Sequence, residues 1–127
     1  MRFLSMVKSV EGGAKMPPPE MFEEVEKWAE KAEKDGTMLM RGGLHPTAGS
    51  VRVRLDGGQI RVIDGPYAEG KEVIGGFSVL AYQSKQDAID SAVAFMELTR
   101  RLWPEWEGEC ELRQMWGPED FAPPAPA

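Results

Sequence analysis

The distribution of apolar and polar residues along the chain predicts alternating strands and helices. A short apolar run at residues 3–7 has the length of a strand buried on both faces, and we expect it to be a central strand. From Glu20 onward, apolar side chains recur every three or four residues, which is typical of an amphipathic helix, and Gly36 ends it. A strand over residues 37–44 follows, in which Gly42 and Gly43 indicate a bulge or a close approach of backbones.

The middle of the chain predicts a β-hairpin followed by a long loop. Apolar residues alternate with arginine over residues 51–55, Asp56-Gly57-Gly58 turns the chain, and the alternation resumes over residues 60–62. Residues 64–76 contain four glycines and a proline, so we expect a loop there. A further strand is expected from Phe77 to Tyr82.

The last third of the chain predicts a second helix and a final strand. Ser84 is a helix cap with Asp87 three residues later, and apolar residues continue at helical spacing until Pro104. A strand over residues 109–116 follows, and the end of the chain from Phe121 is rich in proline and alanine. We therefore expect one domain over residues 1–118 and a C-terminal tail over residues 119–127.

This order of elements predicts an α+β fold. It is the β-α-β-β-α-β plan of the ferredoxin-like fold with a β-hairpin inserted in the middle, and both helices cover one face of such a sheet. The other face is not polar here, because apolar residues occupy both parities of the strands at 3–7 and 77–82. An exposed apolar sheet face indicates a partner, so we expect a homodimer whose sheets pack face to face.

Composition and charge narrow the classes of function. The 127 residues are 42% hydrophobic and 28% charged, as in ordinary globular proteins. Acidic residues outnumber basic ones by 21 to 15, and a net charge of -6 repels nucleic acid and anionic lipid. The single cysteine cannot form an internal disulfide, and no apolar window is long enough for a membrane span or a signal peptide. We expect a cytoplasmic protein without nucleic-acid or membrane partners.

The segment at residues 64–77, DGPYAEGKEVIGGF, resembles the signature of the YCII-related proteins, in the subgroup named after its Asp-Gly-Pro-Phe (DGPF) motif. Residues 43–46 (GLHP), the helix start at Ser84 and residues 111–113 (ELR) are similar to other segments of that family. Tyr67 stands where the family has phenylalanine, Gly70 where it has threonine and Gln114 where it has proline. The resemblance covers roughly residues 1 to 116.

The resemblance implies a ferredoxin-like dimeric α+β barrel with a cleft on each protomer. It does not imply one reaction, because some relatives in the wider superfamily are enzymes, whereas members of this subgroup are often encoded beside extracytoplasmic-function sigma factors. Two classes of function stay open. One is a small enzyme acting on a small anionic organic molecule. The other is a non-catalytic module that binds a metabolite or a protein in sigma-factor regulation.

His45 and Asp64 are the candidate acid–base residues. His45 is the only histidine, and an imidazole exchanges protons near neutral pH. If the strands that end near them meet at one side of the sheet, we expect the ring and the carboxylate within about 8 Å. Each residue also has a structural interpretation: His45 as a turn residue, and Asp64 as a turn carboxylate bonded to backbone amides, followed by Gly65 with a positive φ.

Three arginines share one face of the predicted hairpin, and like charges there require something negative among them. Glu69 and Glu72 are internal candidates, and a small anionic molecule held by the guanidinium groups is the alternative. We also expect the loop after Asp64 to be ordered, with the ring of Tyr67 buried. The candidate substrate-binding residues are Arg52, Arg54, Arg61, Tyr67, Glu69 and Lys71.

The sequence predicts neither a metal nor a cofactor. His45 and Cys110 lie far apart and give no familiar ligand spacing, and a site made of His45, Asp64 and Glu69 is a weaker alternative. No glycine-rich phosphate loop precedes a helix, because Gly75-Gly76 opens a strand. No nucleophile elbow is visible either.

Overall fold

The structure is a computed structural model that describes residues 1–66 and 71–121. Each long element corresponds to one expected from the sequence. The elements in chain order are β1 (Arg2–Val10), α1 (Pro19–Lys34), β2 (Met38–Gly43), the 3-10 turn η1 (Thr47–Gly49), β3 (Val51–Asp56), β4 (Gln59–Asp64), β5 (Glu72–Ala81), α2 (Lys85–Leu102), β6 (Glu109–Gln114) and the 3-10 turn η2 (Pro118–Phe121).

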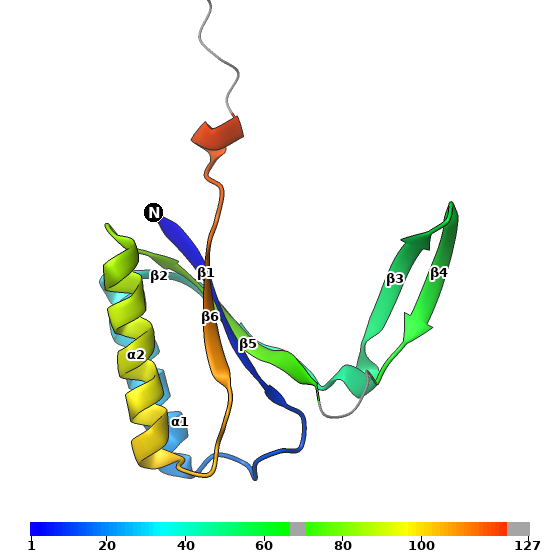
Figure 1. Ribbon diagram of the computed structural model, residues 1–127. Helices are drawn as coiled ribbons and strands as arrows, with labels where there is room; N and C mark the ends of the chain where they lie inside the picture. Colours follow the sequence, from blue (N-terminus) through cyan, green and yellow to red (C-terminus); the bar gives the residue numbers. More distant parts are fainter. Residues whose placement is uncertain (67–70, 122–127) are drawn as a thin grey trace, which may run out of the picture.

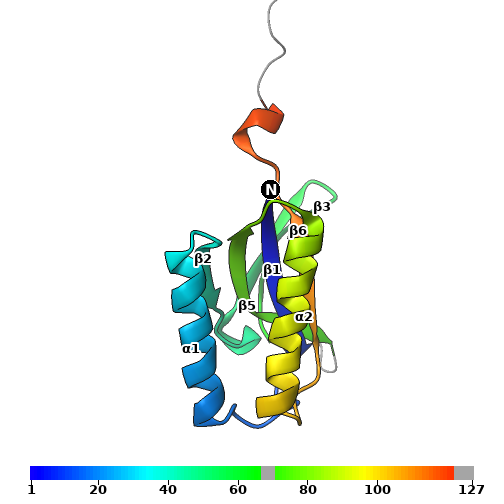
Figure 2. The ribbon, with the colours of Figure 1, turned by 90° about the vertical axis from the view of Figure 1, so that its left-hand side faces the viewer.

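Four of the strands form an antiparallel sheet in the order β2-β5-β1-β6, while β3 and β4 pair only with each other in a two-stranded ribbon. The central position of β1 confirms the prediction for residues 3–7. Both helices cover one face of the sheet, and the ribbon stands on the opposite side (Figure 1, Figure 2). The chain therefore has a ferredoxin-like α+β fold with an inserted hairpin, as predicted. No helix among the described residues is long and apolar enough to cross a membrane.

The predicted helix boundaries are confirmed by their local geometry. Pro19 is the first residue of α1, where a missing N–H costs nothing, and Gly36 follows that helix with a φ of 78°. The Ser84 hydroxyl accepts a hydrogen bond from the Asp87 N–H at 3.1 Å and so caps α2.

The predicted loop over residues 64–76 is wrong in its second half, because β5 begins at Glu72 rather than at Phe77. β1 runs on to Val10, and its last residues pair with residues 72–76 of β5. Cross-strand pairing thus outweighs the low strand preference of Gly75 and Gly76. Residues 67–70 lie outside the described residues, so the ordered loop and the burial of Tyr67 stay predictions.

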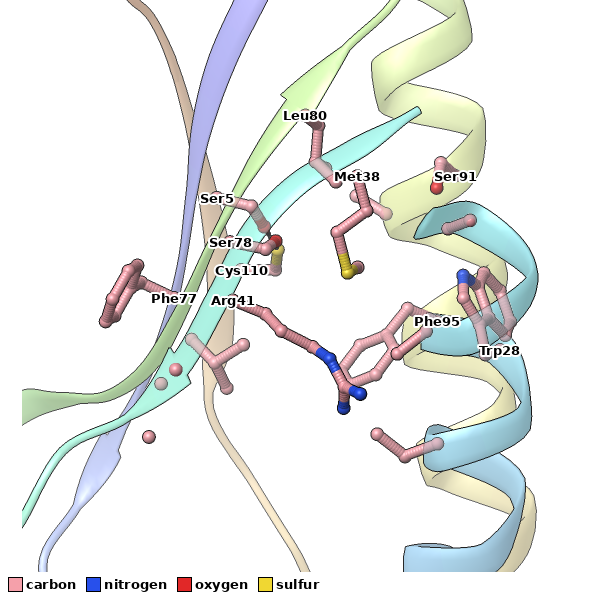
Figure 3. A pocket seen from close by; sticks show the side chains of 18 of the residues that line it. Ser5, Trp28, Met38, Arg41, Phe77, Ser78, Leu80, Ser91, Phe95 and Cys110 are labelled. Atoms are coloured by element: carbon pink, nitrogen blue, oxygen red, sulfur yellow. Dashed lines mark hydrogen bonds between the residues drawn. The ribbon is translucent and has the colours of Figure 1, made fainter. Parts of the chain in front are cut away.

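The glycines of β2 have the close approach expected of them, but not the bulge. A Cβ on Gly42 would lie 2.9 Å from ring atoms of Phe77, so the Phe77 ring packs directly on the Gly42 backbone. The irregularity in the ladder falls earlier, between Met38 and Met40. The Phe77 ring points away from the helices (Figure 3).

Candidate functional site

The corner where the ribbon joins the sheet carries the two candidate acid–base residues. Thr47 of η1 donates from its backbone N–H to one oxygen of Glu11, and from its hydroxyl to the other, both at 2.6 Å. Thr47 is 8% exposed, and its hydroxyl and then its N–H lower the pKa of Glu11. Glu11 follows β1 directly, so this contact attaches the base of the ribbon to the sheet.

Gly65 closes the other side of the same corner. Its N–H donates to the Ser50 carbonyl at 2.7 Å, and a Cβ at this position would lie 1.7 Å from the Thr47 carbonyl oxygen. No L side chain fits there. Gly65 does not have the positive φ that we expected, so this glycine is required for close approach and not for backbone conformation.

His45 and Asp64 therefore lie at the same corner, two residues before Thr47 and one residue before Gly65 respectively. Both side chains are exposed, and no hydrogen bond links them. Their pairing stays a prediction. In the described part of the chain, no three histidine, cysteine or acidic side chains come close enough to hold a metal ion.

The arginine face of the ribbon finds its negative partner within the ribbon. Arg54 Nε and Arg61 Nη2 both donate to Asp56 Oδ2, at 3.3 and 2.9 Å. From the sequence, Asp56 is assigned to the turn, and Glu69 and Glu72 are named as the negative partners instead. Arg61 lies about 10 Å along the strand from Asp64, at roughly 3.3 Å per residue, so these two arginines are not at the corner.

The remaining predicted site residues are Arg52, Lys71, Tyr67 and Glu69. Arg52 pairs with Ile63 in the ribbon and is exposed. Lys71 is exposed immediately before β5. Tyr67 and Glu69 lie outside the described residues.

A second site, which the sequence analysis missed, is a cavity of about 450 Å³ between the sheet and the helices. Its origin lies in the register of the sheet. The layer formed by Phe3, Leu80 and Met38 is large and apolar, whereas the next layer pairs Ser5 with Ser78. Small side chains in that layer leave the space beneath the helices unfilled (Figure 3).

The cavity has apolar walls and a small polar floor. Trp28 of α1 and Phe95 of α2 meet edge to face, with ring centroids 6.1 Å apart, on the helix side. On the sheet side, Ser5 Oγ lies 3.1 Å from Cys110 Sγ, and Ser78 lies beside them (Figure 3). This is the composition of a small-molecule site, in which a few polar groups orient a largely apolar ligand.

Arg41 forms the charged end of the cavity. It lines the cavity, yet its side chain is 35% exposed, so it lies where the cavity opens to solvent. Its guanidinium donates to Glu26 at 2.8 and 2.9 Å and to Glu33 at 2.7 Å, which joins β2 to α1. The bonds to Glu26 and Glu33 raise the pKa of Arg41, and Arg41 lowers the pKa of Glu26.

Comparison with known proteins identifies the family. No protein of curated function matches this chain. The YCII-related domain matches residues 1–95, from β1 into α2, which includes the ribbon and most of the cavity walls. Because this match extends over most of the chain, the protein belongs to the YCII-related domain family.

Proposed function

We propose that this protein binds a small, neutral, mostly apolar molecule in the cavity between its sheet and helices. The observation that carries the proposal is the unfilled volume of about 450 Å³. Pockets for small molecules range from about 300 to 1,000 Å³, and this cavity, which opens to solvent at Arg41, lies within that range. A leucine or valine at the position of Ser5 or Ser78 would fill part of this space, so the two small side chains keep the cavity open.

The residues around the cavity define the class of ligand. An aromatic or branched aliphatic body fits against Trp28, Phe95 and Met38. The hydroxyls of Ser5 and Ser78 can donate or accept, so one carbonyl or hydroxyl of the ligand would meet them. The ligand is therefore a compact apolar molecule with a single polar end.

The charges at the opening favour a neutral ligand over the anion expected from the sequence. One arginine, Arg41, faces two carboxylates, Glu26 and Glu33, which accept three hydrogen bonds from its guanidinium. The local charge is net negative, as is that of the whole chain. An anionic group would meet repulsion from the two carboxylates there, because the single positive charge of Arg41 balances only one of them.

Binding without turnover is the form of function that this cavity supports. The described residues that line it include no histidine and no carboxylate, and its ionisable groups are Arg41, Tyr82 and the thiol of Cys110. A ligand-binding module of this kind is compatible with the regulatory role beside sigma factors that the sequence resemblance implies.

Fluorescence titration with N-phenyl-1-naphthylamine tests the proposal. This probe is neutral and aromatic, and its emission rises in apolar surroundings. We expect saturable binding to the wild type. Ser78→Leu and Ala92→Leu fill the cavity from the sheet and from α2, and each should weaken binding by at least about tenfold. Ala94→Leu is the matched control, because Ala94 is exposed on the same helix and should leave binding unchanged.

The outcomes separate the cavity from other apolar surfaces. Equal binding by folded Ala92→Leu and Ala94→Leu would show that the probe binds elsewhere and would overturn the proposal. Absence of saturable binding to the wild type would do the same. Thermal unfolding of each variant establishes that it is folded before the titration.

A second candidate function is acid–base catalysis at the corner. Its support is the contact of Gly65 with Thr47 and Ser50, which holds the segment of His45 against the end of β4. In this proposal His45 moves the proton and Asp64 orients the imidazole. The NMR shifts of the His45 ring protons should change in Asp64→Asn if the side chains are in contact. Unchanged shifts would show that the side chains of His45 and Asp64 are not in contact and would overturn this proposal.

A further inference from the structure

A separate hollow of about 590 Å³ lies where β1 leaves the sheet, and it shares no lining residue with the cavity described above. Val10 pairs with Glu72, which brings the start of β5 to the end of β1. Lys8 pairs with Glu109, which brings the loop between α2 and β6 to the same end of the sheet (Figure 1). The volume is within the range of small-molecule pockets, about 300 to 1,000 Å³.

The charged side chains that line this hollow are all carboxylates, and we call it the acidic hollow. Glu11 is bonded to Thr47, whereas the other three are exposed and make no hydrogen bond or ion pair within residues 1–66 and 71–121. Carboxylates placed together repel one another unless a positive charge lies among them. The four carboxylates belong to Glu11, Glu72, Glu105 and Glu107.

Two half-buried tryptophans form the aromatic wall of the acidic hollow. The ring centroids of Trp103 and Trp106 are 6.1 Å apart, and the ring planes are inclined by 32°. Trp103 Nε1 is buried and has no hydrogen-bond partner in the part of the chain that the structure describes, so the exposed part of this indole is not its N–H.

The edge of the other indole is also turned into the protein. Atoms Cζ2 and Cη2 of Trp106 pack on the backbone of Gly108, where a Cβ would lie 2.6 and 2.7 Å from them. The edge of an aromatic ring is positive and its face is negative, and the face of tryptophan is the strongest aromatic surface for a cation. Burial of these two positive edges therefore favours a cation in the hollow.

We propose that the acidic hollow binds a small organic ammonium ion. The alkyl groups of the ion lie against the indoles, and its charge lies among the carboxylates. A neutral apolar ligand would leave the repulsion between the carboxylates unrelieved, and an anion would increase it. In the described part of the chain, no three acidic side chains come close enough to hold a metal ion. An organic cation is the remaining class that uses both the charge and the rings.

The charge of the hollow favours a free ammonium ion over the headgroup of a lipid. A phosphocholine headgroup carries a phosphate beside its ammonium, and the carboxylates would repel that phosphate. The net charge of -6 acts in the same direction. We therefore expect vesicles of phosphatidylcholine to leave the signals of the two tryptophans unchanged.

An NMR titration with choline tests the proposal on the wild type. The chain has four tryptophans, of which two line the acidic hollow, so Trp28 and Trp116 serve as internal controls. Choline at millimolar concentration should shift the indole N–H signals of Trp103 and Trp106 saturably, beyond the effect of equal sodium chloride. 3,3-Dimethyl-1-butanol has the shape of choline without its charge, and it should bind at least about tenfold more weakly.

Two variants with the same change in net charge test the carboxylates. Glu105→Gln removes a charge from the acidic hollow, whereas Glu23→Gln removes one from the exposed surface of α1. Glu105→Gln should raise the dissociation constant of choline about threefold, and Glu23→Gln less than about 1.5-fold. Thermal unfolding establishes that each variant is folded before the titration.

Four results would overturn the proposal. These are the absence of a saturable shift of the Trp103 and Trp106 signals, equal binding of choline and its neutral analogue, equal effects of Glu105→Gln and Glu23→Gln, and loss of the two signals on adding phosphatidylcholine vesicles. The last result would assign the hollow to a lipid headgroup instead.

This inference stands apart from the ligand proposed for the cavity between the sheet and the helices. Glu105 does not line that cavity, so Glu105→Gln should bind N-phenyl-1-naphthylamine as the wild type does. Trp28 does line it, and choline should leave the Trp28 signal unchanged. Failure of one proposal is therefore distinguishable from failure of the other.

Discussion

Leu80 of β5 and Leu55 of β3 are the same residue type in two strands of one chain, and their surroundings are opposite. Leu80 is 7% exposed beneath the helices, whereas Leu55 is 73% exposed on the ribbon. Leu80 belongs to a strand with apolar residues on both faces, whereas Leu55 belongs to one in which apolar residues alternate with arginine. The difference teaches that a pattern of alternation shows which residues share a face. Whether anything covers that face depends on the rest of the fold.

The four-stranded sheet with its two helices and the ribbon also differ in the kind of surface that each leaves uncovered. The sheet and its two helices leave a cavity, open to solvent at one end, because the layer of Ser5 and Ser78 is too small to fill the space below the helices. The ribbon exposes an apolar face because no helix of its own chain lies over it. A pocket accommodates a small molecule, whereas a flat open face accommodates another protein surface.

The largest expected effect sharpens the comparison of the two leucines directly. Leu80→Ala should reduce the free energy of unfolding by about 2–5 kcal/mol, because it removes buried methyl groups and leaves a cavity. Leu55→Ala should change it by less than about 0.5 kcal/mol under conditions where the chain is monomeric. Urea unfolding at submicromolar concentration measures both. Similar losses from the two variants would mean that the ribbon is covered within its own chain.

A smaller and opposite effect is expected from filling the cavity. Ala92→Leu should raise the free energy of unfolding by about 1 kcal/mol, because new apolar surface enters existing space. Ala94→Leu on the exposed side of α2 should stay within about 0.5 kcal/mol of the wild type. Thermal and urea unfolding of the pair measure the difference. A loss of stability in Ala92→Leu would indicate that the cavity walls cannot accept the added volume.

The fold was accessible from the sequence because its signals are local. Helical spacing after Glu20, the cap at Ser84 and the alternation in residues 51–62 each specify an element without knowledge of the rest. The error at β5 has a physical cause: the strand assignment of residues 72–76 depends on β1, which is distant in the chain. Pairing with the distant strand β1 therefore makes residues 72–76 a strand, which their local preferences alone do not specify.

The candidate site was less accessible because it depends on register. Ser5 and Ser78 form one layer only because β1 and β5 pair at those positions, and no local pattern reports that. Arg41 and Asp56 were missed for the same reason, since their partners lie across an element boundary or across a turn. The motif at residues 64–66 was visible, but the need for Gly65 comes from Thr47.

The stability of the corner where the ribbon joins the sheet should depend on acidic pH. Thr47 lowers the pKa of Glu11 in the folded chain, so this contact stabilises the fold above the unfolded pKa of glutamate. That contribution is lost as the pH falls through the lower, folded value. The melting temperature of the wild type should therefore exceed that of Glu11→Gln at pH 7, and the gap should shrink from about pH 5 downward.

Glu23→Gln is the control for this pH dependence. Glu23 is exposed on α1, and both variants keep every other carboxylate. The gap between wild type and Glu23→Gln should stay constant over the same pH range. A constant gap for Glu11→Gln as well would show that the contact with Thr47 does not persist in solution.

The smallest expected effect on stability is that of replacing His45, which lies at the same corner. Its side chain is exposed, and neighbouring backbone contacts are made by Leu44, Thr47 and Gly65 without it. His45→Ala should therefore change the free energy of unfolding by less than about 0.5 kcal/mol. A loss above about 1 kcal/mol in urea unfolding would show that the imidazole bonds to the backbone of the turn, as the structural interpretation of the sequence holds. A negligible change would mean that the ring has no structural role. The corner is then held by Glu11, Thr47 and Gly65, and the exposed imidazole of His45 is available for proton transfer.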